Sequence, residues 1–335
     1  MTRRRVFIVV ASAAVSVILL LLVLRDVPLD EVFTSLRVAD AGLVLLALLM
    51  VAFGLAVRGI RWSILLGRRI TYLQATHLVN IMFLGNQLPL RLGEVARGLL
   101  AARNGIPLAT SASSIVAERL IDTLAVVLVI ALTVSQLPGA LPEVTERAAL
   151  FGLLALVCFF ALLGLARFPD VARRLLEGLL NIAPQLRRLP LESILSDVIS
   201  GLKPLTQART ALIIVFWTVV GWIFSLVPYY CLHLALGIET DYVRSVPLGV
   251  ALAALAIAVP VSIAGLGPFQ GAIVVAGQMV GMDPVESISL GFLFHGVTVL
   301  SYALWGTVGL LALGISPKSA FASSDEAPAD KISPE

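Results

Sequence analysis

Charged residues are scarce in this chain, because only 13% of its 335 residues are Asp, Glu, Lys or Arg. A typical soluble domain carries about 25%. Apolar residues make up 59% of the sequence, and several apolar runs approach the ~20 residues that a transmembrane helix needs. The composition therefore predicts an all-α polytopic membrane protein. The alternative, a soluble all-helical protein, would have to bury several such runs.

Cysteine and histidine are also few, and their spacing gives no sign of a cofactor. Cys158 and Cys231 both lie in apolar runs without a CxxC motif, and the three histidines are far apart in sequence. The sequence also contains no Walker-type phosphate loop and no evident nucleophile and base pair. We therefore expect no metal, no cofactor, no nucleotide-driven pump and no nucleic-acid partner.

The apolar runs predict six full transmembrane helices and two shorter, interrupted segments. The first run follows three arginines and is longer than the core of a cleaved signal peptide, which favours an uncleaved signal anchor. A short helix is expected on the outer surface between the first two spans. The predicted spans cover residues 6–24, 41–57, 108–137, 148–166, 211–236 and 285–313.

The distribution of positive charge predicts the orientation of these spans. Seventeen of the 24 Arg and Lys residues fall on segments assigned to the inside, and four fall on segments assigned to the outside. Positive charge concentrates on the cytoplasmic side of membrane proteins, so we expect both termini to be cytoplasmic. The inside set includes four arginines placed just after the second span, Arg58, Arg61, Arg68 and Arg69.

Two apolar segments break before they could complete a crossing. The first, from Thr71 to Gly85, has about 15 residues and would span only ~22 Å of a ~30 Å core. Such breaks predict re-entrant hairpins entered from opposite sides, possible halves of an inverted repeat with a transport site near the midplane, although the halves share no convincing residue identity. The hairpin tips contain the helix-breaking residues Pro89, Gly93, Pro260, Gly265 and Gly267.

The first break is followed by charges that are costly at membrane depth and therefore mark a candidate binding site. Arg91 offers a planar fork suited to a phosphate, and Glu94 could balance that charge or hold Arg97. Glu118 and Asp122 share one helical face and could partner Arg91 and Arg97; structural pairing alone is the alternative. The predicted substrate-binding residues are Arg91, Glu94, Arg97, Glu118, Arg119, Asp122 and Gln270.

Polar residues outside this stretch have simpler interpretations. Gln270 is the one side chain of the second break able to make several hydrogen bonds. His295 could relay protons, but a core histidine with satisfied hydrogen bonds is favoured. Asp283 and Glu286 should cap the start of the last span.

Residues 1–314 are expected to form a single transmembrane domain. Within it, residues 168–209 carry basic residues and apolar residues at helical spacing, which predicts amphipathic helices on anionic headgroups of the inner leaflet. A solvated linker is the alternative. Residues 315–335 are polar and are expected to be a disordered cytoplasmic tail.

Three motifs in this order resemble the lysylphosphatidylglycerol synthase transmembrane-region family of flippase-like integral membrane proteins: PLRLGEVAR (89–97), ERLID (118–122) and SIAGLGPFQG (262–271). The resemblance covers roughly residues 6–314. It implies a multi-pass protein of a prokaryotic cytoplasmic membrane that translocates or handles lipids. The best-known member adds a soluble aminoacyl-transferase domain; this sequence shows none, so we expect no synthase activity. The family often has Glu where Gln270 stands, which puts a carboxylate role there in doubt.

The favoured function is a lipid flippase for an anionic or polyprenyl-phosphate-linked lipid, and the family name does not fix the substrate. One alternative is a membrane-embedded glycosyl or headgroup transferase that uses a lipid-phosphate donor. A non-transporting partner in a lipid-synthesis complex is another. The charges suit salt bridges better than a catalytic acid or base, which favours transport over catalysis. A homo-oligomer or a lipid-synthesis enzyme as partner stays open.

Overall fold

A computed structural model describes residues 3–25, 27–88, 92–137, 142–258 and 262–321. Pro89, Arg91 and Pro260 lie outside the described residues, so the predictions made for them stay predictions. The described part of the chain is built from helices and contains no strand. This confirms the all-α class that the composition predicted.

The first half of the chain contains two long helices that enclose two short ones. A helix and a short connector precede this set. The helices are α1 (Arg3–Leu24), α2 (Leu29–Arg37), α3 (Ala41–Leu65), α4 (Tyr72–Gly85), α5 (Leu92–Arg103) and α6 (Leu108–Val134).

The second half has the same order of long and short helices. Its first long helix is followed by a polar segment of short helices, and a short helix ends the described chain. The elements are α7 (Pro142–Arg167), α8 (Pro169–Ile182), η2 (Pro184–Arg188), α9 (Leu191–Leu202), η3 (Lys203–Thr206), α10 (Ala208–Ala235), α11 (Tyr242–Ala258), α12 (Pro268–Met279), α13 (Pro284–Ala312) and α14 (Pro317–Phe321).

Four described helices are long and apolar enough to cross a membrane, namely α3, α7, α10 and α13. The consecutive helices α1 and α2, bent by 92°, give a fifth candidate. Helix α6 is 27 residues long, but Glu118, Arg119 and Asp122 lie close together within it. The protein is thus a multi-pass membrane protein, and the span predicted at residues 108–137 corresponds to this charged helix.

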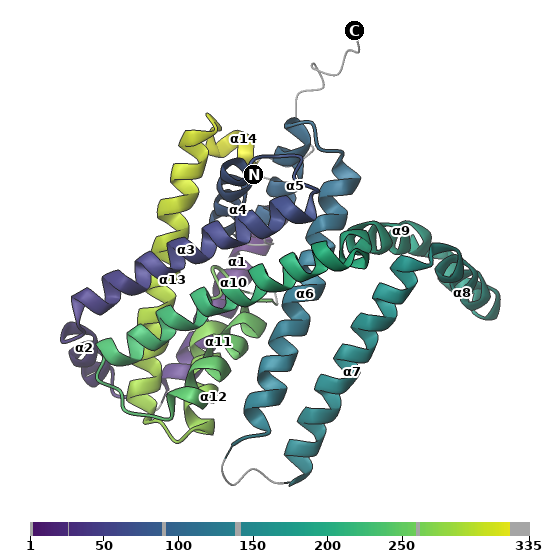
Figure 1. Cartoon of the computed structure of the whole chain (residues 1–335). Helices are drawn as coiled ribbons and strands as arrows, with labels where there is room; N and C mark the ends of the chain where they lie inside the picture. The colour runs from purple at the N-terminus through teal and green to yellow at the C-terminus, as the bar shows by residue number, and fades with distance from the viewer. Residues whose placement is uncertain (1–2, 26, 89–91, 138–141, 259–261, 322–335) are drawn as a thin grey trace.

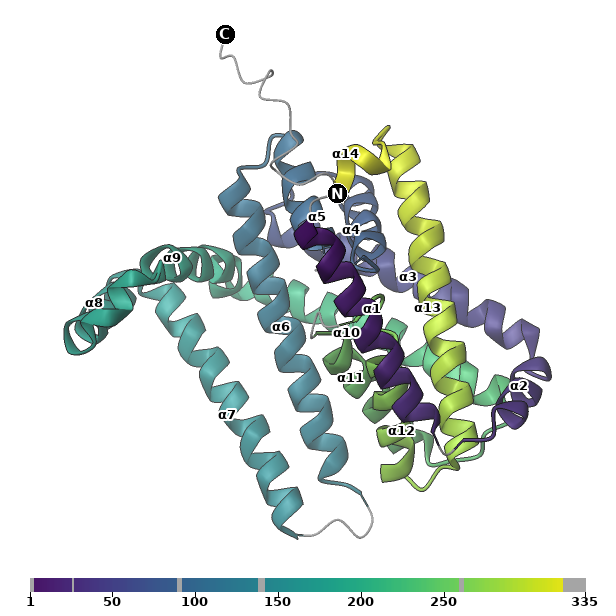
Figure 2. The same ribbon diagram turned by 180° about the vertical axis from the view of Figure 1, so that it is seen from behind.

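The short helices of the two halves lie toward opposite ends of the molecule. Helix α3 crosses α10, α4 packs against α13, and the corresponding helix α11 packs against α6. The short pair α4 and α5 lies toward one end of the molecule, and α11 and α12 lie toward the other (Figure 1; Figure 2). Helices α6 and α13 run in opposite directions between these ends. This arrangement is the one that an inverted repeat requires.

Helix α3 extends further than the sequence predicted. The span expected to end at Val57 continues to Leu65, so Arg58 and Arg61 lie within the helix and not in a cytoplasmic loop. Neighbouring helices provide partners for both guanidinium groups. Arg58 donates to Ser225 Oγ at 3.1 Å and lies over the ring of Phe83, and Arg61 is buried.

The segment 168–209 contains the helices that its apolar spacing predicted, and part of it packs on protein. A Cβ added at Gly201 would lie 2.1 Å from the carbonyl oxygen of Ser113, so α9 approaches the backbone of α6 closely. Helix α14 begins inside the segment that was predicted to be a disordered tail. Ala320 is buried in a core formed mainly by α3, α4 and α5, and Phe321 packs against the same core. Residues 317–321 of that segment are thus helical.

Candidate functional site

Six charged side chains from three helices meet in one network. Arg61 comes from α3, Glu94 and Arg97 from α5, and Glu118, Arg119 and Asp122 from α6. Three positive and three negative charges make the network neutral as a whole, which lowers the cost of burying it. Five of its members are predicted binding residues; Arg61 is not among them.

Arg61 and Asp122 form the closest pair of the network. Arg61 Nη1 donates to Asp122 Oδ1 at 2.6 Å, and Nη2 donates to Oδ2 at 2.9 Å. Arg61 Nη2 also lies 3.6 Å from Glu118 Oε1, and Nη1 lies 3.4 Å from Thr218 Oγ1 on α10. This bidentate geometry fixes the guanidinium plane and ties α3 to α6.

Arg97 lies at the fully buried end of the network. Its Nη1 donates to Glu118 Oε2 at 3.1 Å, and its guanidinium lies 4.6 Å from the centre of the Trp62 ring. Trp62 in turn donates from Nε1 to Ser114 Oγ at 3.0 Å. A buried cation held by a carboxylate and an aromatic face stabilises the contact among α3, α5 and α6.

Arg119 and Glu94 form the open end of the network. Arg119 Nε lies 3.6 Å from Glu94 Oε1, and neither atom has a hydrogen-bond partner among the described residues. Both side chains line a groove of about 380 Å³ between α6 and α7, whose other walls are mainly apolar. A partly exposed ion pair therefore lines an otherwise apolar groove.

The observed partners differ from those that spacing suggested. The sequence suggested Arg91 or Arg97 as partners for both Glu94 and Asp122. In the structure Glu94 pairs with Arg119, and Asp122 pairs with Arg61. Glu118 does meet Arg97. Arg91 lies outside the described residues. The sequence does contain a sign that Arg61 belongs to the helix. Apolar residues follow Arg61, which indicates that the helix does not end at Val57.

Glycine at position 93 allows the first pair of short helices to pack closely. A Cβ added there would lie 1.9 Å from the carbonyl oxygen of Met82, so α5 begins in direct backbone contact with α4. The second break uses glycine differently: Gly265 and Gly267 have φ of +78° and +93°. These are conformations that residues with a Cβ rarely adopt.

Gln270 and His295 form a neutral network beside the second break. Gln270 Nε2 lies 2.8 Å from His295 Nδ1, and Gln270 Oε1 accepts from the backbone N–H of Gly267 at 2.9 Å. His295 Nε2 lies 2.9 Å from the carbonyl oxygen of Ala264. Both side chains are buried, and both ring nitrogens have partners. The histidine therefore has the satisfied core environment that the sequence favoured, and the polar groups of Gln270 are used within the protein.

Described residues beside the two breaks line one small cavity. It has a volume of about 70 Å³ and is lined from the first half by Phe83 and Asn86, and from the second by Gly265 and His295. Helix α1 also reaches the second break, where Ser16 Oγ accepts from the backbone N–H of Ile263 at 2.9 Å. Asp283 accepts from the N–H of Val285 at 2.7 Å and so caps α13 as expected.

In both halves, the short helix that follows the break contacts the next long helix at the same position. Glu94 and Gln270 are each the third residue of a 12-residue helix, α5 and α12. Their partners, Arg119 and His295, are each the twelfth residue of the long helix that follows, α6 and α13. The halves therefore share a structural polar contact, although the residues that form it differ.

These features define an all-α, multi-pass membrane protein whose described residues form two pairs of short helices and a buried charge network. The chain belongs to the family described as the Lysylphosphatidylglycerol synthase TM region, which matches residues 9–306. It is 27% identical over 248 residues to a UPF0104 membrane protein of Methanothermobacter thermautotrophicus, which covers 68% of this chain and 71% of that protein. No solved structure matches the chain.

Proposed function

We propose that the protein translocates an anionic or polyprenyl-phosphate-linked lipid across the cytoplasmic membrane. The lipid headgroup would contact Arg119 and Glu94, and its hydrocarbon chain would lie in the groove between α6 and α7. The observation that carries this proposal is the combination of apolar walls and a partly exposed ion pair in one groove.

The walls of the groove suit a hydrocarbon chain. They include Ile115, Leu124 and Val127 on α6 and Phe159 and Leu162 on α7. Helix α7 contributes little to the packed interior, since only 6% of its most apolar 18-residue stretch is buried. Helix α7, which forms one side of the groove, thus has an exposed apolar surface that lipid can contact.

The ion pair at the groove suits an exchange of partners. Arg119 lies within 3.6 Å of Glu94 and 3.5 Å of Glu118, so it would keep one carboxylate if a lipid phosphate replaced the other. Its planar guanidinium can bind phosphate oxygens through two parallel hydrogen bonds. The buried pairs of Arg61 and Arg97 would stay intact and hold α3, α5 and α6 in place.

The proposal includes an orientation in the membrane. The short helices α4 and α5 would form one re-entrant hairpin and α11 and α12 the other, since α4 with 14 residues spans only about 21 Å. That length is short of a ~30 Å hydrocarbon core. The excess of arginine on the segments assigned to the inside supports cytoplasmic termini.

The groove can be tested by filling it without changing a charge. Ala155 lies on α7 in the groove, and we expect Ala155→Trp to lower the rate of lipid translocation roughly tenfold, because the ring occupies volume that a chain needs. Ala161, on the same helix, is exposed and lies outside the groove lining, so Ala161→Trp is the matched control.

The measurement uses the full chain reconstituted in vesicles that contain a fluorescent anionic lipid. Quenching of the outer leaflet then reports exchange between leaflets, at matched protein content for the wild type and both variants. Equal slowing by both substitutions would remove the groove from the proposal. A wild type that moves no lipid faster than protein-free vesicles would refute translocation of that lipid class.

A further inference from the structure

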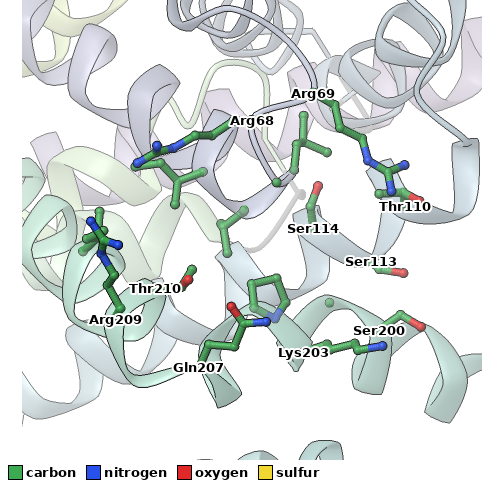
Figure 3. A pocket seen from close by; sticks show the side chains of 17 residues that line it. Arg68, Arg69, Thr110, Ser113, Ser114, Ser200, Lys203, Gln207, Arg209 and Thr210 are labelled. Carbon is green, nitrogen blue, oxygen red and sulfur yellow. The ribbon is translucent and has the colours of Figure 1, made fainter.

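A second cavity, separate from the groove, lies where α3 ends and α6 and α10 begin. Its volume is about 640 Å³, and α9 and η3 close one side of it. Figure 3 shows side chains from all these segments around one space. We call it the basic pocket, and its rim carries Arg68, Arg69, Lys203 and Arg209.

The charge of the basic pocket is not compensated by carboxylates of the described residues. Four cations line it together with several hydroxyl groups, and no Asp or Glu is among its lining residues. Within the described part of the chain, none of the four cations has a carboxylate within 4.0 Å. This contrasts with the neutral network of Arg61, Arg97 and Arg119, in which every guanidinium has a carboxylate partner.

The turn that carries two of the cations is held in a fixed conformation. Gly67 and Arg68 both have positive φ, of +69° and +59°, which is uncommon for a residue other than glycine. The turn is closed by hydrogen bonds from Arg68 N–H to the Ser63 carbonyl at 2.7 Å and from Ser63 Oγ to the Ile70 carbonyl at 2.8 Å. Arg68 and Arg69 are therefore presented at the rim by a constrained turn.

We infer that the basic pocket binds a phosphate group that carries two or more negative charges, such as a phosphomonoester or a diphosphate. A phosphodiester, with one negative charge, would leave most of the positive charge uncompensated. Hydroxyl groups of Thr110, Ser200 and Thr210 stand among the cations and can donate to phosphate oxygens (Figure 3). The same phosphate chemistry is available from a lipid headgroup of the inner leaflet or from a soluble phosphate compound. The inference does not depend on lipid translocation.

The alternative explanation of these cations is the general excess of positive charge on the cytoplasmic side. Matched double substitutions separate the two. Arg69→Gln with Arg209→Gln removes two cations from opposite sides of the pocket and leaves the constrained Arg68 unchanged (Figure 3). Arg174→Gln with Arg188→Gln removes two exposed cations from the polar segment outside the pocket and serves as the control.

The experiment measures binding of inorganic pyrophosphate by calorimetry to the full chain in nanodiscs of neutral phosphatidylcholine. We expect the wild type and the control to bind alike and the pocket variant to bind about tenfold more weakly, a modest effect because the cations are exposed. Equal loss in both variants would overturn the inference, because total charge alone would then explain binding. Absence of binding by the wild type would also overturn it.

Nanodiscs that contain phosphatidic acid identify the source of the phosphate. If the lipid headgroup occupies the pocket, apparent affinity for pyrophosphate should fall in the wild type and stay unchanged in the pocket variant. If affinity stays the same in the wild type, the pocket binds a soluble phosphate compound. Both outcomes support a phosphate site, and only the first assigns it to the membrane.

Discussion

Replacing Arg61 with leucine should lower the free energy of unfolding by about 3–5 kcal/mol, the usual cost of leaving a buried charge without its partner. Arg61 is 4% exposed and is the nearest cation to both oxygens of Asp122. Without it, Asp122 loses two hydrogen bonds and Glu118 loses one of three positive neighbours. The Asp122 side chain is 30% exposed, so water recovers part of this cost and we expect the lower half of the range.

A charge-neutral double substitution provides the decisive comparison. Arg61→Leu with Asp122→Leu removes the closest pair and leaves Arg97, Arg119, Glu94 and Glu118 balanced. We expect the double variant to be more stable than Arg61→Leu alone, because no unpartnered carboxylate is left. Arg61→Lys should have an intermediate effect of roughly 1.5–3 kcal/mol, since an ammonium keeps the charge but cannot bind both oxygens in parallel.

Equilibrium unfolding in mixed detergent micelles, followed by fluorescence of the four tryptophans, measures these differences. Arg147→Leu is the control, because its pair with Glu143 is largely exposed and should contribute less than about 1 kcal/mol. If the double variant lost the full sum of the two single losses, Arg61 and Asp122 would not be coupled. The account of a network that holds α3 against α6 would then be refuted.

Two further substitutions test the breaks. Gly93→Ala should sharply reduce the amount of folded protein recovered in detergent, because the new Cβ would lie 1.9 Å from a backbone oxygen. Gly164→Ala on α7, where a Cβ would have no atom within 4 Å, should leave the recovered amount unchanged or slightly higher. Equal recovery of the two variants would contradict the close contact of α4 and α5. Gln270→Leu should lower the free energy of unfolding by about 2–5 kcal/mol, measured by tryptophan fluorescence in mixed micelles, because Gly267 N–H and His295 Nδ1 lose their partner. Gln278→Leu, on the exposed face of α12, should change stability little. Similar losses in the two variants would argue against the buried network.

Hydropathy was sufficient to predict the positions of most helices. The breaks near Gly93 and Gly267 were visible because apolar runs ended too early to cross a membrane. Helix α8 (Pro169–Ile182) was visible because Leu recurs at helical spacing among arginines. These features depend on neighbours in sequence, which is the information that a single sequence contains.

Partner choice within the charge network could be predicted only in part. The spacing of Glu118 and Asp122 shows that both face one side of a helix, but it does not show which cation lies opposite. Arg61 is opposite Asp122 because α3 crosses α6 at that height, and this crossing depends on how several helices pack together. The rule that arginine marks the end of a span gave the wrong position for Arg61, because a carboxylate on another helix compensates its charge.

The equivalent contacts in the two halves show how one scaffold can have two different roles. The third residue of the helix after each break contacts the twelfth residue of the next long helix, as Glu94 with Arg119 and as Gln270 with His295. In the second half this contact is a short, buried hydrogen bond between neutral groups, which have no net charge to attract an ion. In the first half it is a longer contact between charged groups at an open groove, so its partners can exchange with a charged ligand. The phosphate of a lipid in the groove should therefore engage Arg119 and Glu94, while Gln270 and His295 keep their hydrogen bond.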